Sequence, residues 1–287
     1  MVQHLKMTVL VDNIAKPPCR AEWGLSILIE ADGKTILLDT GSSGQFAENA
    51  ELLGIDLAAV EVGVLSHAHY DHADGMDAFF SRNDTARFLI RGCSRENCFG
   101  MDNGAPKYIG IRRGLMEEYR ERICFTDGLY EISDGILLVP HRPADYSAIA
   151  LRSDLYTCPA DTACSREVLC PDDFSHEQSL VVDTEAGLVV FNSCSHTGMP
   201  NILEDVKEAL GRQDVFAYVG GLHLFKLTDA EIDRLCGEID EIGLKHIFTG
   251  HCTGDHAYQL LSGRLGDRIV QFCSGFRCKI IETGGIP

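Results

Sequence analysis

Positive charge is scarce in this sequence of 287 residues, which contains 25 Lys and Arg residues against 43 Asp and Glu residues. The formal net charge is −18. A surface this acidic repels the phosphates of nucleic acids and the anionic headgroups of membranes. We therefore expect neither nucleic acid nor membrane as a partner, and the charge also argues against a nuclease.

Long apolar runs are lacking as well. No stretch approaches the roughly 18 apolar residues needed to span a bilayer. The segment Met1–Asn13 has one Lys and a short apolar run, which predicts a first β-strand rather than a secretion signal. We therefore expect a cytoplasmic globular protein, in which the 12 Cys residues are reduced thiols, some of them metal-linked.

The chain repeats one style of organisation in its two halves: hairpins come first, and strand–loop–helix units follow. The predicted hairpins are Leu25–Glu30 with Thr35–Leu38, and Ser179–Asp183 with Leu188–Asn192. A capping signal at Thr228 predicts a helix over 229–242. This order indicates two stacked sheets covered by helices, in a single α/β domain over 1–287.

Two stretches, near 92–122 and 141–177, show no clear period, and we interpret them as insertions, the second as a lid. The second stretch holds Cys158, Cys164 and Cys170, with five residues between successive cysteines. Zinc and iron–sulfur sites usually use closer pairs of cysteines. Free thiols or a local lid structure are therefore favoured over a second metal site.

The strongest signal is a cluster of polar residues directly after the apolar strand Val60–Leu65. His67 and His69 are two residues apart, so an extended backbone points both imidazoles to the same side. Asp71 and His72 follow where the chain turns. Imidazole and carboxylate groups are ligands that suit zinc, iron or manganese. This cluster predicts a metal site.

Two further histidines follow predicted strands in the second half of the chain. His196 comes after Leu188–Asn192, and His251 comes after His246–Phe248. Small residues adjoin both, which lets a metal or substrate approach. Together with the first cluster, they are predicted metal ligands.

These motifs, with Leu37-Leu38-Asp39-Thr40-Gly41, resemble the metallo-β-lactamase-fold superfamily over nearly the whole chain. The resemblance implies a four-layer αββα sandwich with a dinuclear site at one edge. It implies two divalent metal ions, zinc foremost, with manganese or iron as alternatives. By the same resemblance Asp39 supports the ligands; one metal takes His67, His69 and His196, and the other takes Asp71, His72 and His251.

Finer motifs resemble the dihydropterin synthase-like branch of that superfamily: Cys194–Gly198, Gly220–Leu224 and Thr249–Gly254. Archaeal members of the branch join a hydroxymethyl-dihydropterin diphosphate to a ribofuranosyl-aminobenzene phosphate. The resemblance implies a transferase that acts on a phosphorylated or diphosphate small molecule. Two alternatives stay open: a hydrolase of a phosphoester, lactone or thioester that uses metal-bound hydroxide, and a metal-holding ligand sensor without catalysis.

The sequence departs from the superfamily at His223, which stands where most hydrolases carry an Asp that bridges the metals. A neutral imidazole has one lone pair and cannot bridge as a carboxylate does. Two divalent ions, Asp71 and one hydroxide leave a site charge of about +2, one more than with a bridging Asp. This charge favours an anionic substrate, and His223 is predicted to act on it or to serve as a terminal ligand.

Other residues are weaker candidates. His176 is a candidate catalytic acid or base beside Asp71 and His223, as is the adjacent Glu177, with surface polar residues as the alternative. Lys107 and Arg112 are candidates for capture of the substrate anion, with a solvated loop as the alternative. Cys252, next to His251, is either a soft metal ligand or a group that supports the ligands.

Overall fold

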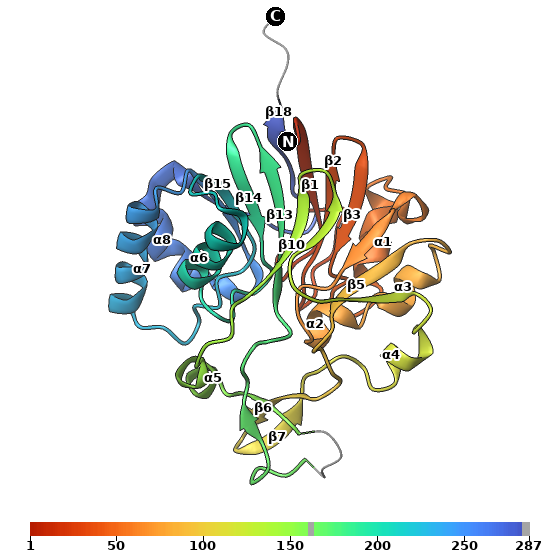
Figure 1. The fold of residues 1–287 in the computed structure, drawn as a ribbon, viewed down its shortest axis with the longest axis vertical. Helices are drawn as coiled ribbons and strands as arrows, with labels where there is room; N and C mark the ends of the chain where they lie inside the picture. The colour runs from red at the N-terminus through yellow and green to blue at the C-terminus, as the bar shows by residue number, and fades with distance from the viewer. Residues whose placement is uncertain (160–163, 283–287) are drawn as a thin grey trace, which may run out of the picture.

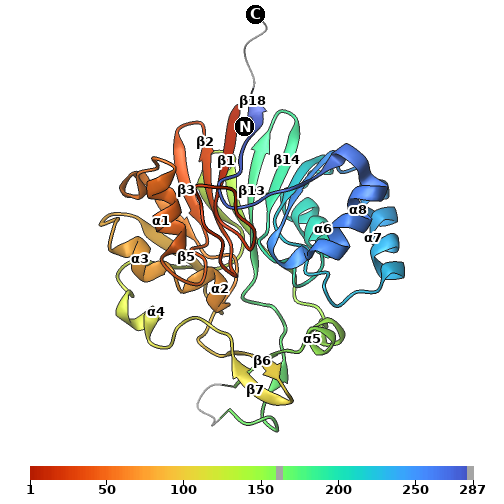
Figure 2. The ribbon, with the colours of Figure 1, turned by 180° about the vertical axis from the view of Figure 1, so that it is seen from behind.

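The computed structural model of the chain describes residues 1–159 and 164–282. Two β-sheets pack face to face at the centre of the molecule, and helices cover the outer side of each sheet (Figure 1). The same four layers are visible from behind (Figure 2). The predicted αββα sandwich is thus confirmed.

The first sheet comes mostly from the N-terminal half and has seven strands in the order β18-β1-β2-β3-β4-β5-β8. Asp32 and Gly33, both with positive φ, form the tight turn between β2 and β3 that the Asp-Gly pair predicts. The elements of this half are β1 (His4–Val11), β2 (Ser26–Ala31), β3 (Lys34–Leu38), β4 (Val62–Val64), β5 (Arg87–Arg91), β8 (Ile123–Thr126) and β18 (Arg277–Glu282), with α1 (Gln45–Leu52), α2 (Tyr70–Ala73), α3 (Met76–Phe80), α4 (Leu115–Glu118) and the short 3₁₀ helix η1 (Leu57–Ala59).

The second sheet also has seven strands, in the order β17-β16-β15-β14-β13-β10-β9. Its helix α7 begins at a capping box formed by Thr228 and Glu231 and ends at Gly243 in the left-handed conformation, as predicted. The elements are β9 (Tyr130–Ser133), β10 (Ile136–Pro140), β13 (Gln178–Thr184), β14 (Gly187–Phe191), β15 (Val215–Val219), β16 (His246–Thr249) and β17 (Ile269–Gln271), with α6 (Met199–Leu210), α7 (Asp229–Ile242), α8 (Asp255–Leu265), η2 (His251–Thr253) and η3 (Gly266–Arg268).

The main hydrophobic core lies between the two sheets. Ile27 and Ile29 of the first sheet belong to the same buried cluster as Val189 and Phe191 of the second. All five residues of β14 are buried, because the other sheet covers one face and helices cover the opposite face. The sandwich therefore provides a rigid frame whose strand ends carry the polar loops.

A third, small sheet forms from the two stretches that lack a clear sequence period. Its strands are β6 (Cys98–Asp102), β7 (Ala105–Tyr108), β11 (Leu155–Thr157) and β12 (Cys170–Pro171), in the order β12-β11-β6-β7. Helix α5 (Ser147–Ser153) precedes β11. The small sheet lies at the end of the sandwich opposite the N-terminus and β18 (Figures 1 and 2). The two stretches are therefore one structural unit.

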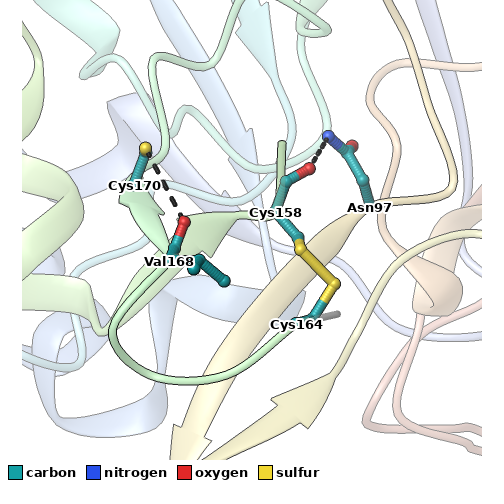
Figure 3. Close-up of a disulfide and its surroundings, with 5 residues drawn as sticks. All are labelled: Asn97, Cys158, Cys164, Val168 and Cys170. Carbon is teal, nitrogen blue, oxygen red and sulfur yellow. Dashed lines mark hydrogen bonds between the residues drawn. A yellow bond between two sulfur atoms is a disulfide. The ribbon is translucent and has the colours of Figure 1, made fainter. Parts of the chain in front are cut away.

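A disulfide joins Cys158 and Cys164 in this unit, with their Cα atoms 5.8 Å apart (Figure 3). The prediction of reduced thiols is wrong for this pair, and the pair leaves no three-cysteine metal site there. The Cys158 carbonyl oxygen accepts a 2.9 Å hydrogen bond from Asn97 Nδ2, which ties the segment to β6. The Cys170 thiol instead faces the carbonyl oxygen of Val168.

Within the described residues, none of the helices combines the length and the apolar character that a membrane span requires.

Candidate metal centre

The predicted ligands meet at one edge of the sandwich, where loops follow three strands. The loop after β4 holds His67 and His69, and α2 at its end holds Asp71 and His72. The loop after β14 holds His196, and η2 after β16 begins at His251. Strands β14, β15 and β16 are parallel neighbours, so their carboxyl ends reach the same edge. The first sheet presents the end of β4 to this edge, and the small sheet lies beyond it, with Tyr70 N donating to Ile109 O.

The first three histidines form a compact group. One ring nitrogen from each of His67, His69 and His196 lies within 4.8 Å of the others. These side chains are buried, and no residue in the described part of the chain forms a hydrogen bond with their Nε2 atoms. Burial lowers the pKa of His67, His69 (to about 3) and His196, so their imidazoles are neutral. Neutral, buried and unpartnered nitrogens fit a metal ion.

The second group consists of Asp71, His72 and His251. His251 Nε2 lies 3.2 Å from His72 Nε2 and 3.5 Å from an Asp71 carboxylate oxygen, and His72 Nε2 lies 3.8 Å from that oxygen. Ligand atoms around a tetrahedral zinc ion are about 3.3 Å apart, given bonds of about 2.0–2.1 Å. Although burial opposes ionisation of Asp71, His72 and His251 lower its pKa. The group therefore offers one carboxylate and two imidazoles.

Asp39 fixes the orientation and the proton of His72. Its Oδ1 accepts a hydrogen bond from Ser66 N at 2.7 Å, and its Oδ2 accepts from Ser66 Oγ at 2.6 Å and from His72 Nδ1 at 2.8 Å. With its proton on Nδ1, His72 keeps the lone pair of Nε2 for a metal. Ser66 Oγ also lies 2.8 Å from His67 Nδ1 and orients that ring in the same way. Asp39 thus lies behind His72 and His67, and its supporting role stays a prediction.

Two buried carboxylates hold the loops that carry His196 and His251. The sequence did not predict this anchoring role for either of them. Glu177 accepts hydrogen bonds from His196 N at 2.8 Å and from Thr197 N at 3.2 Å. Asp12 accepts from His251 N at 2.8 Å, and burial raises the Asp12 pKa to about 6. Each carboxylate fixes the backbone beside a predicted ligand. Both are far from those ligands in sequence, and Glu177 was considered only as a candidate acid or base.

His176 packs behind the first group. Its Nδ1 accepts a hydrogen bond from Ala68 N at 3.2 Å, and its Nε2 lies 3.1 Å from a carboxylate oxygen of Asp172. Its ring centre is 5.5 Å from that of His69. Both ring nitrogens are thus engaged within the protein, and the acid–base role of His176 stays a prediction.

The two predicted anion-binding residues differ in their surroundings. Arg112 forms 2.9 Å ion pairs with both Asp77 and Glu118, which neutralise its charge. Lys107 is exposed on β7 of the small sheet. The structure therefore gives Arg112 a local structural partner rather than a place among the ligands.

His223 and two thiols complete the centre. The His223 ring lies 4.4 Å from the His196 ring, and neither of its nitrogens has a hydrogen-bond partner in the part of the chain that the structure describes. The ligand atoms of Cys194, His223 and Cys252 lie within 4.8 Å of one another. Cys194 Sγ is 3.2 Å from His72 Nε2, and the two thiols are 3.5 Å apart. The sequence reasoning considered Cys252 but not Cys194.

Two cavities open beside the centre. One, of about 250 Å³, is lined by His196 and His223 and by charged residues of both signs: Arg152, Arg234, Glu231 and Glu238. Arg152 forms a 3.1 Å ion pair with Glu231. The other, of about 510 Å³, is lined by residues that include His251, Trp23 and Phe225. The two arginines and the two aromatic side chains therefore line different cavities.

The two aromatic side chains stand at the centre although they are about half exposed, Trp23 at 48% and Phe225 at 49%. The Trp23 ring lies 5.3 Å from the His251 ring, and the Phe225 ring lies 4.6 Å from the His223 ring. Exposed large aromatics that flank a polar site commonly contact a ligand. The sequence reasoning missed both, because nothing local in the sequence links either residue to the histidines.

Comparisons with known proteins agree with the fold. The family model described as the metallo-β-lactamase superfamily matches residues 24–137. A 7,8-dihydropterin-6-methyl-4-(β-D-ribofuranosyl)-aminobenzene-5′-phosphate synthase from Methanocaldococcus jannaschii is 27% identical over 266 residues, which cover 88% of this chain and 89% of that protein.

Solved structures extend the likeness to three dimensions. A metal-dependent hydrolase of the β-lactamase superfamily is 29% identical, with a TM-score of 0.80 over 96% of this chain and 98% of that chain. A diphosphatase from the PhnP family shares the fold at 13% identity, with a TM-score of 0.53 over 96% of this chain and 97% of that chain. The similarity in fold therefore spans nearly the whole chain, including both halves that supply the predicted ligands.

Proposed function

Since the chain belongs to the metallo-β-lactamase superfamily and is an enzyme, we propose that it uses two divalent metal ions to act on a phosphorylated or diphosphate small molecule. The observation that carries this proposal is the pair of adjacent three-residue groups, one of which points three buried, unpartnered Nε2 atoms at a common point within the described structure. With catalysis established for the family, a sensor without catalysis is set aside.

The residues that would hold the ions are the predicted ones. One group is His67, His69 and His196, and the other is Asp71, His72 and His251. Bound divalent ions polarise oxyanions and lower the pKa of water. Zinc is the first candidate, with manganese and iron next, because imidazole and carboxylate ligands suit all three.

The preferred reaction is a group transfer in which an aromatic amine displaces a diphosphate from carbon. The synthase relative is named for a product that joins a pterin ring to an aminobenzene ring bearing a phosphorylated sugar. In this chain Trp23 and Phe225 would stack on a planar ring beside the two ligand groups. Arg234 would hold a phosphate in the cavity next to His223, which would hold or move a proton at a ring nitrogen.

Hydrolysis is the second candidate, favoured by the likeness at a TM-score of 0.80 to a metal-dependent hydrolase. The substrate would then be a phosphoester, lactone or thioester, and water would replace the amine. The same cavities and ligands serve both reactions, so the co-substrate distinguishes them.

The test uses protein stripped with a chelator and reconstituted with zinc, manganese or iron. Each form is given a hydroxymethyl-dihydropterin diphosphate, with and without an aminobenzene ribofuranosyl phosphate, and then phosphoesters, lactones and thioesters. Diphosphate release that depends on the amine supports transfer, whereas amine-independent release supports hydrolysis.

Two results would overturn the proposal. The first is turnover of unphosphorylated lactones or thioesters alone. The second is binding of fewer than two ions per chain in every reconstituted form. His256→Ala is the matched control for removal of a ligand histidine, because His256 is an exposed residue of α8 that pairs with Asp229.

A further inference from the structure

Cys194 adjoins both predicted ligand groups, because its thiol has a neighbour in each of them. Its Sγ lies within 4.8 Å of a ring nitrogen of His67, in the first group, and of one of His72, in the second. We propose that Cys194 Sγ is a thiolate ligand that bridges the two ions. This inference rests on the proposed dinuclear site and adds a seventh protein ligand to it.

The distances suit a shared ion. Zinc–sulfur bonds of about 2.3 Å and zinc–nitrogen bonds of about 2.0–2.1 Å put two ligands of one tetrahedral ion roughly 3.6 Å apart. Cys194 Sγ lies 3.2 Å from His72 Nε2. His72 Nε2 is also the atom that Asp39 leaves free by binding Nδ1. The thiol and the imidazole therefore converge on the second metal position.

The loop after β14 explains how the chain directs two neighbouring residues to two ions. Asn192 Oδ1 accepts a hydrogen bond from Ser195 N at 2.7 Å, and Ser195 Oγ donates to Gly221 O at 2.6 Å. Ser195 itself has a φ of 56° in the left-handed region. This turn separates Cys194, which faces His72, from His196, which faces the first group. A fixed turn of this kind pre-organises ligands.

The surroundings of Cys194 differ from those of a core cysteine. A free buried cysteine commonly packs as a small hydrophobic residue. Cys194 is 3% exposed, yet its thiol contacts an imidazole nitrogen and a second thiol. Buried polar donors and acceptors gathered around a thiol are the environment of a ligand rather than of an apolar core.

Cys194 can also bridge two ions, which His223 cannot do. A thiolate has more than one lone pair and can bond to two ions, whereas a neutral imidazole bonds to one. When the ions bind, the S–H bond breaks, its proton passes to solvent, and sulfur–metal bonds form without any change in oxidation state. The thiolate lowers the site charge from about +2 to about +1, the value of a carboxylate-bridged centre. The extra positive charge predicted from the sequence is then cancelled.

Cys252 acts as a positioning residue for this thiolate. Its Sγ donates a hydrogen bond to Cys194 Sγ at 3.5 Å. A Cβ atom at Gly221 would lie 2.4 Å from Cys252 Sγ, so the glycine makes room for the second thiol. We expect Cys252 to tune the bridge without bonding to both ions.

The test is reconstitution with cobalt(II), whose bonds to thiolate give an intense charge-transfer absorption band in the near ultraviolet. The variants are Cys194→Ser, Cys194→Asp and Cys252→Ser. The control is Cys236→Ser, since Cys236 is a buried cysteine of α7 in the helix-covered core. The parent and the control should show the band. Cys252→Ser should keep a shifted band, and both Cys194 variants should lose it.

Metal content separates a ligand role from a packing role. Cys194→Ser should bind the ions about 10–100-fold more weakly, the usual effect of disturbing a metal's surroundings. Cys194→Asp should retain two ions without the band, because it returns an anionic oxygen to the bridging place. Should either variant fail to fold, X-ray absorption of the parent's zinc form should still show sulfur at about 2.3 Å.

The thiolate bridge is refuted if the cobalt band survives in Cys194→Ser, or if the parent binds two cobalt ions with no thiolate band. In both cases the proposed dinuclear enzyme stands. If the parent binds no cobalt, zinc, manganese or iron, the proposed function fails together with the bridge.

Discussion

Replacement of Asp39 by Asn should remove the second metal ion while leaving the first in place. The parent carboxylate accepts three hydrogen bonds, from Ser66 N, Ser66 Oγ and His72 Nδ1, at 2.6–2.8 Å. Asn has nearly the same shape and tolerates the left-handed backbone of this position, where φ is 59°. It offers one accepting oxygen and one donating nitrogen in place of two accepting oxygens.

The amide has two possible orientations, and both disturb the site. If its oxygen stays on Ser66 N, its NH₂ group faces His72 Nδ1, and the His72 proton must move to Nε2, where it blocks the metal. If the amide flips, the NH₂ group faces Ser66 N–H, and a buried donor is left unsatisfied at a cost of about 1–3 kcal/mol. We expect affinity for the second ion to fall about 10–100-fold, the usual effect of losing such a partner.

The affinities are measured by competition with a chromophoric chelator at fixed pH, and ¹⁵N NMR of the imidazole reports which His72 nitrogen carries the proton. Asp183→Asn is the control, because it makes the same change in charge at another residue. The Asp183 side chain pairs with Arg212, and its backbone contacts the N-terminal segment. Two ions bound to Asp39→Asn as tightly as to the parent would show that Asp39 does not set the His72 proton.

Three further predictions concern the site and its cavities. Asp71→Asn should bind one ion instead of two in elemental analysis and lose at least about 10²-fold in kcat, because Asp71 is the one carboxylate of the proposed ligand set; full metal content would contradict that set. His223→Ala should keep both ions and lose about 10²-fold in kcat/KM, as for one lost acid–base group, whereas release of an ion would make His223 a ligand. Trp23 is the sole tryptophan, so binding of a dihydropterin diphosphate should quench the intrinsic fluorescence of the protein. Trp23→Leu should weaken binding of this ligand by about 1 kcal/mol, roughly fivefold. Unchanged affinity would exclude stacking of the ligand on Trp23.

Local signals in the sequence predicted most of the sandwich. The Asp32-Gly33 pair sets the β2–β3 turn, and the pairing of Thr228 with Glu231 sets the start of α7. The ligand group 67–72 was equally visible because its members are adjacent in sequence. In each case the physical cause acts within a few residues.

Features that depend on distant contacts could not be predicted. The strand pair β6–β11 joins residues far apart in the chain, and neither strand has a hydrophobic period of its own. Glu177 becomes an anchor of His196, and Cys194 becomes a neighbour of His72, only after the two sheets pack. The same holds for Arg112, whose charge is taken up by Asp77 and Glu118.

Each ligand group combines residues from both sheets. His67 and His69 extend from the first sheet and His196 from the second; Asp71 and His72 likewise meet His251 across the interface. If the proposed ions bind there, their affinity and the association of the sheets would be thermodynamically reciprocal: a change that loosens one would weaken the other by the same free energy. Phe191→Ala, which would create a cavity in the core between the sheets, would therefore weaken ion binding at the edge of the sandwich. Chelation would in turn lower the melting temperature of the entire sandwich.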